Sequence, residues 1–217
     1  MVSSEREMDT QAHWENVYRT RGEQQTSWYR PRLDTSLALI DELGLRVNDA
    51  LIDVGCGRAT LIDGLLDRGH RDVTALDVSD AALGECRARL GVRASSVKWL
   101  ASDVLAAALP DAHYALWHDR AVFHFMVDAA DRVHYAERAA RAVRPGGWLV
   151  IATFALDGPE RCSGLEVCRY DAVMLSRAFA DWFALDYDTR EEHVTPSGAV
   201  QRFTWVVLQR RGDSRKD

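Results

Sequence analysis

The 217-residue sequence predicts an α/β fold: a parallel sheet with helices on both faces and an antiparallel hairpin at its C-terminal end. Two observations support this prediction. Between residues 50 and 154, short apolar segments alternate with segments of helical periodicity, which is the pattern of repeated βα units. Beyond residue 155 the alternation stops, and two extended segments are joined by Thr195-Pro196-Ser197-Gly198, a turn sequence that predicts a hairpin.

Two helices are expected before the first strand. Residues 9–21 form an amphipathic helix with two aromatic side chains on its apolar face, and a second helix runs from about 33 to 43. Between them, Trp28 and Tyr29 stand in a loop that ends at a proline. Large aromatics in a loop are exposed unless they cover something, so these two pack on the first helix, close over a ligand, or do both.

The remaining elements follow in order, and right-handed crossovers between strands make the sheet parallel. The expected strands are residues 50–54, 72–77, 97–101, 114–118, 148–154, about 183–194 and 200–208. The expected helices are 58–68, 80–90, about 131–143 and 171–180. Pro145-Gly146-Gly147 predicts a turn, and polar loops are expected after residue 155. No repeat or linker interrupts the chain, so residues 1–217 are expected to form one domain.

Composition excludes several classes of protein. With 47% apolar and 28% charged residues the chain is of the soluble globular type, and its net charge of −6 argues against a nucleic-acid partner. No segment approaches the roughly 18 apolar residues of a membrane span. Residues 1–7 are polar and lack the apolar core of a signal peptide, so we expect a cytoplasmic protein without a membrane partner. Four cysteines without paired spacing indicate neither a metal site nor a disulfide framework.

The segment 50–60 combines a strand, a tight turn and a helix start. Gly55 and Gly57, with Cys56 between them, allow a ligand to approach the backbone closely. A dinucleotide fingerprint needs a third glycine at position 60, where Thr60 stands, and the Gly-Lys-Ser/Thr of a P-loop is absent. What remains is Asp53-x-Gly55-x-Gly57 at the end of the first strand.

This pattern resembles motif I of the class I S-adenosylmethionine (SAM) methyltransferases. The resemblance implies a Rossmann-like, seven-stranded, mostly parallel sheet and SAM as the cofactor, which is converted to S-adenosylhomocysteine (SAH). SAM carries an ammonium and a sulfonium group, so a carboxylate such as Asp53 complements it, and free backbone N–H groups at a helix start can meet its carboxylate. The alternative is a glycine-rich turn that binds no ligand.

Two further acids stand at the ends of the next strands, where ligands bind in open α/β sheets. Asp77 lies 24 residues after Asp53, close to the roughly 20-residue offset at which an acid meets ribose hydroxyls. In methyltransferases of this class an acid at the position of Asp103 receives the adenine amino group, with the following backbone N–H facing the ring. Asp77 could instead cap the next helix together with Ser79, and Asp103 could be the N-cap of the next helical turn. The neighbouring residues predicted to line the cofactor site are Val78, Ser102 and Val104.

The fourth strand and the residues after it supply the predicted substrate side. The segment 119–124 resembles the Asp-Lys-Gly-x-x-Asp stretch of methyltransferase-like lysine methyltransferases, with Arg120, Ala121 and His124 at the changed positions. We predict that Asp119 contacts the cofactor and orients the acceptor, and that His124 is the general base, because a neutral imidazole can take a proton near pH 7. The alternative for His124 is a histidine packed among the adjacent phenylalanines.

Three hypotheses of function follow. The first is a SAM-dependent methyltransferase acting on a small-molecule thiol, amine or hydroxyl compound, with an enclosed aromatic pocket expected around residues 119–125 and 154–170. The second is a protein lysine methyltransferase, because Trp14-Glu15-x-x-Tyr18 and Trp28-Tyr29 resemble the N-terminal region of that group and of its small bacterial relatives. The third is a SAM-binding protein without transferase activity. In each case residues 1–45 are expected to form a helical lid region, with Trp28 and Tyr29 over the cofactor, and residues 46–217 the Rossmann-like core.

Overall fold

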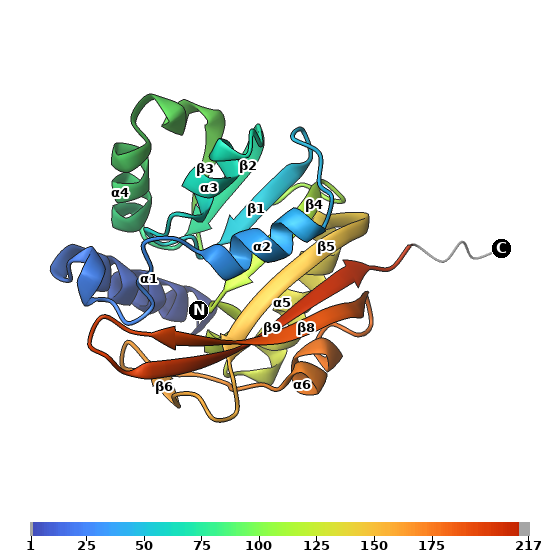
Figure 1. The fold of residues 1–217 in the computed structure, drawn as a ribbon. Coiled ribbons are helices and arrows are strands. Elements are labelled where there is room, and N and C mark those ends of the chain that lie inside the picture. Colours follow the sequence, from blue (N-terminus) through green and yellow to red (C-terminus); the bar gives the residue numbers. More distant parts are fainter. Residues whose placement is uncertain (1, 213–217) are drawn as a thin grey trace.

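The computed structural model describes residues 2–212, with side chains from residue 10 onward. Figure 1 shows a central sheet flanked by helices, with α1 at the left. The helices are α1 (Val2–Thr20), α2 (Asp34–Glu42), α3 (Leu61–Asp67), α4 (Asp80–Leu90), α5 (Ala129–Ala142) and α6 (Ala172–Arg177). Short 3-10 turns are η1 (Glu23–Gln25), η2 (Gly91–Ser96) and η3 (Phe123–Phe125). None of the described helices is both long and apolar enough to cross a membrane.

Seven strands form the main sheet in the order β3-β2-β1-β4-β5-β9-β8. They are β1 (Ala50–Val54), β2 (Asp72–Asp77), β3 (Val97–Ala101), β4 (Tyr114–Arg120), β5 (Val143–Phe154), β8 (Phe183–Val194) and β9 (Val200–Arg210). The first five pair in parallel, whereas β9 is antiparallel to both β5 and β8. The predicted fold class is therefore confirmed. The strand order reverses between β1 and β4, and in open α/β sheets such a reversal marks the binding crevice.

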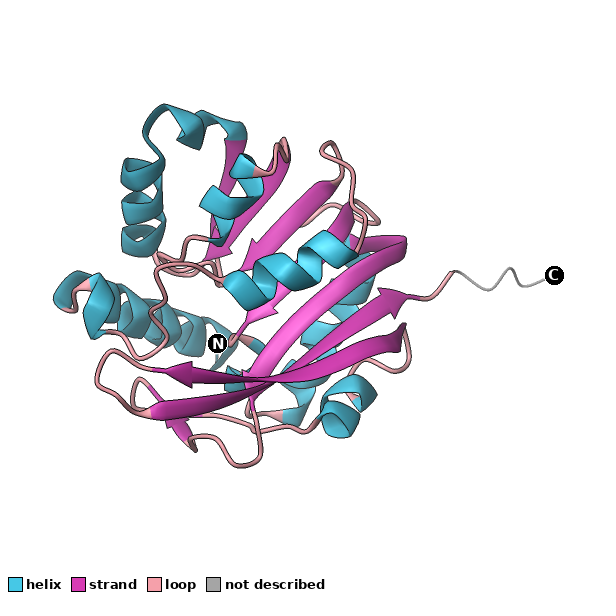
Figure 2. Ribbon diagram, in the orientation of Figure 1, coloured by secondary structure: helices cyan, strands magenta, loops and turns pink. Residues whose placement is uncertain are grey.

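Helices cover both faces of the sheet (Figure 2). Side chains of α5 and α6 form one apolar cluster with the sheet, including Trp117 and Tyr135. Side chains of α2, α3 and α4 form the other, including Leu37 and Phe203. Because successive residues of a strand point to opposite faces, each β4 residue faces the α5 side or the α2 side in turn. This alternation decides which of its polar groups reach the cavity described below.

Some predicted boundaries were wrong. Pro145-Gly146-Gly147 is not a turn between elements: it lies within β5, where Gly146 has φ 74° and the pairing with β4 shifts register. A bulge adds residues to one strand without ending it, which is why its sequence resembles a turn. The polar loop after residue 155 contains a small two-stranded sheet, β6 (Arg161–Cys162) with β7 (Leu165–Glu166). The helix expected at 58–68 begins only at Leu61, because the glycine bend extends to Thr60.

Candidate functional site

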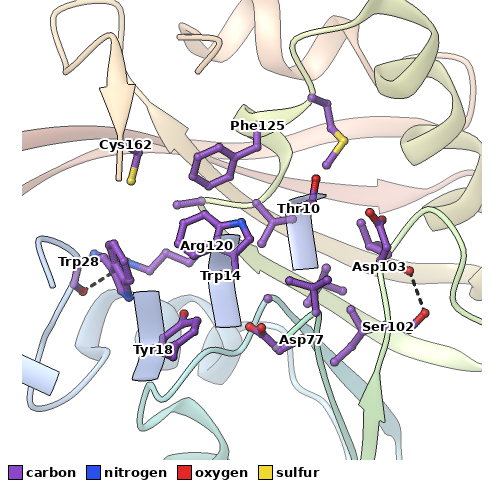
Figure 3. Close-up of a pocket in the computed structure, with 18 of the residues that line it drawn as sticks. Thr10, Trp14, Tyr18, Trp28, Asp77, Ser102, Asp103, Arg120, Phe125 and Cys162 are labelled. Carbon is purple, nitrogen blue, oxygen red and sulfur yellow. Dashed lines mark hydrogen bonds between the residues drawn. The ribbon is translucent and has the colours of Figure 1, made fainter. Parts of the chain in front are cut away.

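A cavity lies at the carboxyl ends of β1, β2 and β4, partly covered by α1 (Figure 3). It encloses an empty volume of about 840 Å³ including its mouth, within the range of small-molecule sites. In Figure 3, Ser102 and Asp103 lie at one side, while Arg120, Trp28 and Cys162 lie at the opposite side. The cavity therefore has two ends of different chemistry, and Asp77 lies between them.

Two glycines shape the floor of the site. Gly55 and Gly57 have φ of 64° and 53°, in the left-handed region that favours glycine. A Cβ atom at Gly55 would lie 2.0 Å from a methyl of Val122, and one at Gly57 would lie 2.5 Å from the Tyr18 hydroxyl. The contacts with Val122 and Tyr18 and the positive φ both require glycine at these two positions of the predicted bend.

Asp77 lines the cavity as predicted. Its carboxylate accepts hydrogen bonds from the backbone N–H groups of Gly57 and Ser79, each at 2.8 Å. It thus ties the glycine bend to Ser79. That serine is the N-cap of α4, since its hydroxyl accepts from the backbone N–H of Ala82, so Asp77 supports the cap and does not itself cap the helix. Burial raises the pKa of Asp77 to about 6, against the lowering effect of these two hydrogen bonds. Its remaining lone pairs can accept further donors from a ligand.

The far end of the cavity is formed by the loop after β3. Asp103 lines the cavity, and its Oδ1 accepts a hydrogen bond from the backbone N–H of Leu105 at 2.7 Å. This bond holds a turn at residues 104–106, because no helix lies between β3 and β4 among the described elements. Trp28, Gly55, Asp77, Val78, Ser102, Asp103 and Val104 are the predicted cofactor residues that line the main cavity.

Asp53 does not line this main cavity. Together with Cys56 and Gly57 it lines a smaller adjoining cavity, which shares Tyr18, Trp28, Gly55 and Arg120 with the main one. Asp53 Oδ1 lies 2.7 Å from Nδ1 of His118, and Nε2 of that histidine lies 3.0 Å from the Ser36 hydroxyl. These two pairs link β1, β4 and α2 behind the glycine bend.

Asp119 is placed differently from the expectation. It is fully buried and lines neither cavity. Its carboxylate accepts hydrogen bonds from the backbone N–H groups of Val122 and Phe123 and from the Tyr135 hydroxyl of α5. The alternation along β4 directs Asp119 to the α5 face, so it cannot touch an acceptor in the cavity. The direct role is therefore corrected: Asp119 holds the 121–125 loop.

His124 and Tyr29 do not line the cavity either. The His124 ring lies 4.4 Å from that of Phe125 and 4.8 Å from that of Phe154, and neither ring nitrogen has a hydrogen-bond partner among the described residues. Burial, with the nearby Arg120 charge, lowers the pKa of His124 to about 3. Such an imidazole takes up a proton poorly near pH 7, so this geometry does not suit a general base. The packed alternative describes it better.

The prediction missed the residues that α1 contributes. Thr10, Trp14 and Tyr18 line the cavity from above, and the Trp14 ring lies 5.7 Å from Trp28 and 5.2 Å from Phe125. Their spacing on one helical face was visible in the sequence, but not what the face covers. Within the segments 119–125 and 154–170, where an aromatic pocket was expected, the lining residues are Arg120, Ala121, Val122, Phe125, Phe154 and Cys162. The missed lining residues from elsewhere in the chain are Val54, Leu76, Met126 and Phe203.

Glu15 fastens α1 over the cavity. Its Oε2 accepts hydrogen bonds from the Ser79 hydroxyl at 2.6 Å and from the backbone N–H of Ala81 at 3.1 Å. A carboxylate at the first turn of α4 is also favoured by the helix dipole. Arg58 adds a second fastening, because it donates to the Tyr18 and Arg21 carbonyls. These contacts hold Trp14 and Tyr18 above the glycine bend.

The end of the cavity near Trp28 contains one cation and one thiol. Arg120 donates from Nη1 to the Trp28 carbonyl at 3.3 Å, and its guanidinium lies 4.8 Å from the centre of the Phe203 ring. Burial lowers the pKa of Arg120 to about 10, which leaves it charged at pH 7. Burial raises the pKa of Cys162 to about 12, so the thiol stays protonated.

Ala121 carries backbone strain beside the cavity. Its φ is 75°, a left-handed conformation that costs a non-glycine residue about 1 kcal/mol or more. We expect Ala121→Gly to raise the free energy of unfolding by up to about 1 kcal/mol, measured by urea denaturation. Ala88→Gly, in the last turn of α4, is the control and should lower it by roughly 0.5 to 1 kcal/mol. Equal losses from both substitutions would contradict the strain at Ala121.

The fold and cavity define the class: a Rossmann-like domain with a ligand site at the strand reversal, built from a glycine bend and strand-end acids. Residues 51–147 match the family model of a methyltransferase domain. That segment contains the glycine bend, Asp77, Asp103 and Arg120.

Two curated relatives are similar over part of their length. The eEF1A lysine and N-terminal methyltransferase of Mus musculus is 24% identical over 120 residues, which are 55% of this chain and 17% of the relative. An uncharacterized methyltransferase of Mycobacterium bovis is 30% identical over 117 residues, 54% of this chain and 56% of the relative. The matched region thus spans less than two thirds of either relative.

Solved structures share the fold over nearly the whole chain. One, described as "Conversion of a Disulfide Bond into a Thioacetal Group during Echinomycin Biosynthesis", has a TM-score of 0.73 at 19% identity and covers 95% of this chain and 94% of its own. The 1,6-didemethyltoxoflavin-N1-methyltransferase of Burkholderia thailandensis, with that compound and SAH bound, has a TM-score of 0.68 at 19% identity, covering 94% and 87%. Together with the family match, these findings confirm the resemblance to SAM-dependent methyltransferases and support an enzyme with SAM as its cofactor.

Proposed function

We propose that this chain transfers a methyl group from SAM to a small-molecule nucleophile, a thiol, an amine or a hydroxyl compound. The observation that carries the proposal is the cavity end opposite Asp103, which we call the acceptor end. It is lined by Trp28, Phe125, Phe154, Cys162 and Phe203, with Arg120 as its charged group. Aromatic walls with few polar groups are typical of small-molecule sites. The Burkholderia thailandensis enzyme of the same fold holds a small compound.

The residues present fit the cofactor. In this proposal Asp77 accepts the ribose hydroxyls, and Asp103 with the Val104 backbone meets the adenine, which their shared place in the cavity lining supports. Gly55 lines the main cavity and Gly57 the adjoining one, so the methionine end is proposed to approach the backbone of this bend. SAM supplies a methyl group already activated by its sulfonium. The chain itself then has to align the acceptor and exclude water.

Residues 1–45 act as a lid in this proposal. Trp14 and Tyr18 on α1 and Trp28 in the following loop form an aromatic cover over the cavity. Their ring faces favour a cation and keep water away from the reacting atoms. Tyr29 is proposed to act only by supporting this loop, since it does not line the cavity.

The acceptor end offers no evident proton acceptor. Among the described lining residues on that side, Arg120 is a cation and Cys162 is a protonated thiol, while Asp77 and Asp103 belong to the cofactor side. A general base needs a pKa near the working pH and reach to the acceptor. An acceptor that is nucleophilic without help from a base, a thiol with appreciable thiolate or an amine, therefore fits better than an alcohol.

A lysine side chain is the second candidate, because the Mus musculus relative is named as a lysine and N-terminal methyltransferase. A protein lysine needs an open groove with acids that receive its cation. The described lining residues at the acceptor end include no carboxylate, and Arg120 repels an ammonium group. These features favour the small-molecule reading.

Incubation with labelled SAM tests the proposal. Separate pools of thiols, amines, phenols and a protein extract are supplied, and SAH release and labelled product are measured. We expect label in a low-molecular-weight product, with thiols or amines ahead of phenols. Label in protein alone would overturn the small-molecule assignment, and SAH binding without any transfer would favour the binding protein without activity.

A further inference from the structure

Arg120 is the one lining residue of the acceptor end that is charged at pH 7, among the residues the structure describes. It ends β4, and strand alternation turns it away from Asp119 and toward Phe203. Nη1 is occupied by the Trp28 carbonyl, but Nη2 is buried and has no hydrogen-bond partner among the described residues. Arg120 lines both the main cavity and the adjoining one.

No described carboxylate forms an ion pair with this guanidinium. The charge of Glu191, on β8, raises the pKa of Arg120 against the larger effect of burial, but this carboxylate pairs with Arg30 at 3.0 Å and accepts hydrogen bonds from Thr35 and from the Trp205 indole. Arg120 forms no ion pair within residues 10–212. A buried cation without an anionic partner is costly, and an unsatisfied buried donor adds to the cost. Such a group persists where it acts on a ligand.

We propose that Arg120 binds an anionic group of the acceptor, so that the substrates are anionic small molecules, carboxylic acids with an apolar or aromatic body. The inference rests on the proposed function and specifies its substrate class. The planar fork of an arginine matches a carboxylate, and the aromatic walls around it match the body that carries the acid. Transfer then proceeds at a nucleophile on that body, with the acid as the fixed handle.

The carboxylate that Arg120 binds could instead be the one at the methionine end of the cofactor. The position of Arg120 favours the acceptor, because the side chain extends to Phe203 of β9 and to the Trp28 carbonyl, on the far side of the cavity from Asp103. The two sources make different predictions for binding. If Arg120 binds the acceptor, its substitution changes the affinity for acids in the presence of SAH. If Arg120 binds the cofactor, its substitution changes the affinity for SAH itself.

Calorimetry on the SAH-saturated protein separates them without requiring turnover. The probes are thiosalicylate, anthranilate and 3-phenylpropionate, each paired with its methyl ester. We expect the acids to bind about 10- to 100-fold more tightly than the esters, as for a charge-assisted hydrogen bond to a buried partner. Arg120→Gln should abolish this preference, and Arg120→Lys should retain part of it. Arg202→Gln, which removes an exposed arginine paired with Glu192, is the control and should leave the preference unchanged.

Equal or undetectable binding of acids and esters by the unmodified protein would overturn the proposal. So would a loss of SAH affinity in Arg120→Gln that matches the loss for the acids. SAH binding and far-ultraviolet circular dichroism show whether each variant is folded. If Arg120→Gln does not fold, Arg120→Lys provides the test. An acid preference that depends on Arg120, with no methyl transfer to any probe, would support the anion site and count against the proposed function alone.

Discussion

Asp77→Ala is expected to weaken SAH and SAM binding by about 1 to 3 kcal/mol, because charge-assisted hydrogen bonds to the ribose are lost. The substitution also frees the N–H groups of Gly57 and Ser79, which Asp77 holds at 2.8 Å. Asp77→Asn separates the two effects, since its amide oxygen can keep one of these bonds. Calorimetry with SAH measures both variants. Unchanged affinity in Asp77→Ala would refute the ribose role.

The raised pKa of Asp77 gives this prediction a pH dependence. Its pKa is about 6 in the folded chain, against an ordinary value of 3.8, and burial is the main cause. Ribose hydroxyls donate to the ionised form, so SAH affinity should rise as the pH increases from about 5 to 7, and Asp77→Asn should remove most of that rise. A pH-independent affinity in the unmodified protein would contradict the assignment.

The raised pKa of Asp77 also makes stability depend on pH, but stability falls with rising pH whereas SAH affinity rises. The folded pKa lies above the ordinary value, so the folded chain binds more protons between about pH 4 and 6 than the unfolded chain does. Asp119 is shifted likewise, to about 6. Both groups therefore favour the folded state fully below about pH 4, and the free energy of unfolding falls as the pH rises through 6. Urea denaturation of the ligand-free protein measures this change.

Asp119→Ala is expected to lower the free energy of unfolding by roughly 2 to 4 kcal/mol. The carboxylate is costly to bury, as its raised pKa shows, but its removal leaves two backbone N–H groups and the Tyr135 hydroxyl buried without their acceptor. The 121–125 loop lines the cavity through Val122 and Phe125, so transfer should fall as well.

Tyr135→Phe is the matched control for Asp119. It removes one of the three donors and keeps the carboxylate and the loop hydrogen bonds, but it also removes the acceptor of the buried Trp117 indole N–H at 3.0 Å. We expect a loss of roughly 1 to 3 kcal/mol and a clear coupling energy in the double-mutant cycle, because the two groups touch. If Asp119→Ala removed transfer without changing the free energy of unfolding, the positioning role would be wrong and direct contact with the acceptor would be supported.

Much of the cofactor side could be predicted because it depends on local rules. Parallel strands end at one edge of a sheet, so acids that end successive strands are brought near one another, and Asp77 and Asp103 line one cavity. Gly55 and Gly57 were expected because a bend between strand and helix needs positive φ, and both have it. The predicted lining role of Trp28 likewise agrees with its place in the cavity.

The acceptor side could not be predicted in the same way. The end of β4 places Asp119 and Arg120 on opposite faces, and one residue of register decides which of them reaches the cavity. The periodicity of the sequence shows the alternation but does not say which face is covered by α5. For His124, packing against the adjacent Phe125 was one of the alternatives, and the missing information was the contact with Phe154 of β5, a separate part of the chain.

The sequence by itself determined the sheet class, the glycine bend and the strand-end acids of this protein, since each follows from contacts between near neighbours or from the geometry of one βα unit. Only the tertiary structure decided that α1 covers the cavity, that Asp119 supports a loop, and that Arg120 is the charged group at the acceptor end. These three features depend on which distant segments of the chain pack together. The free energy of burial, rather than local backbone preference, determines that packing.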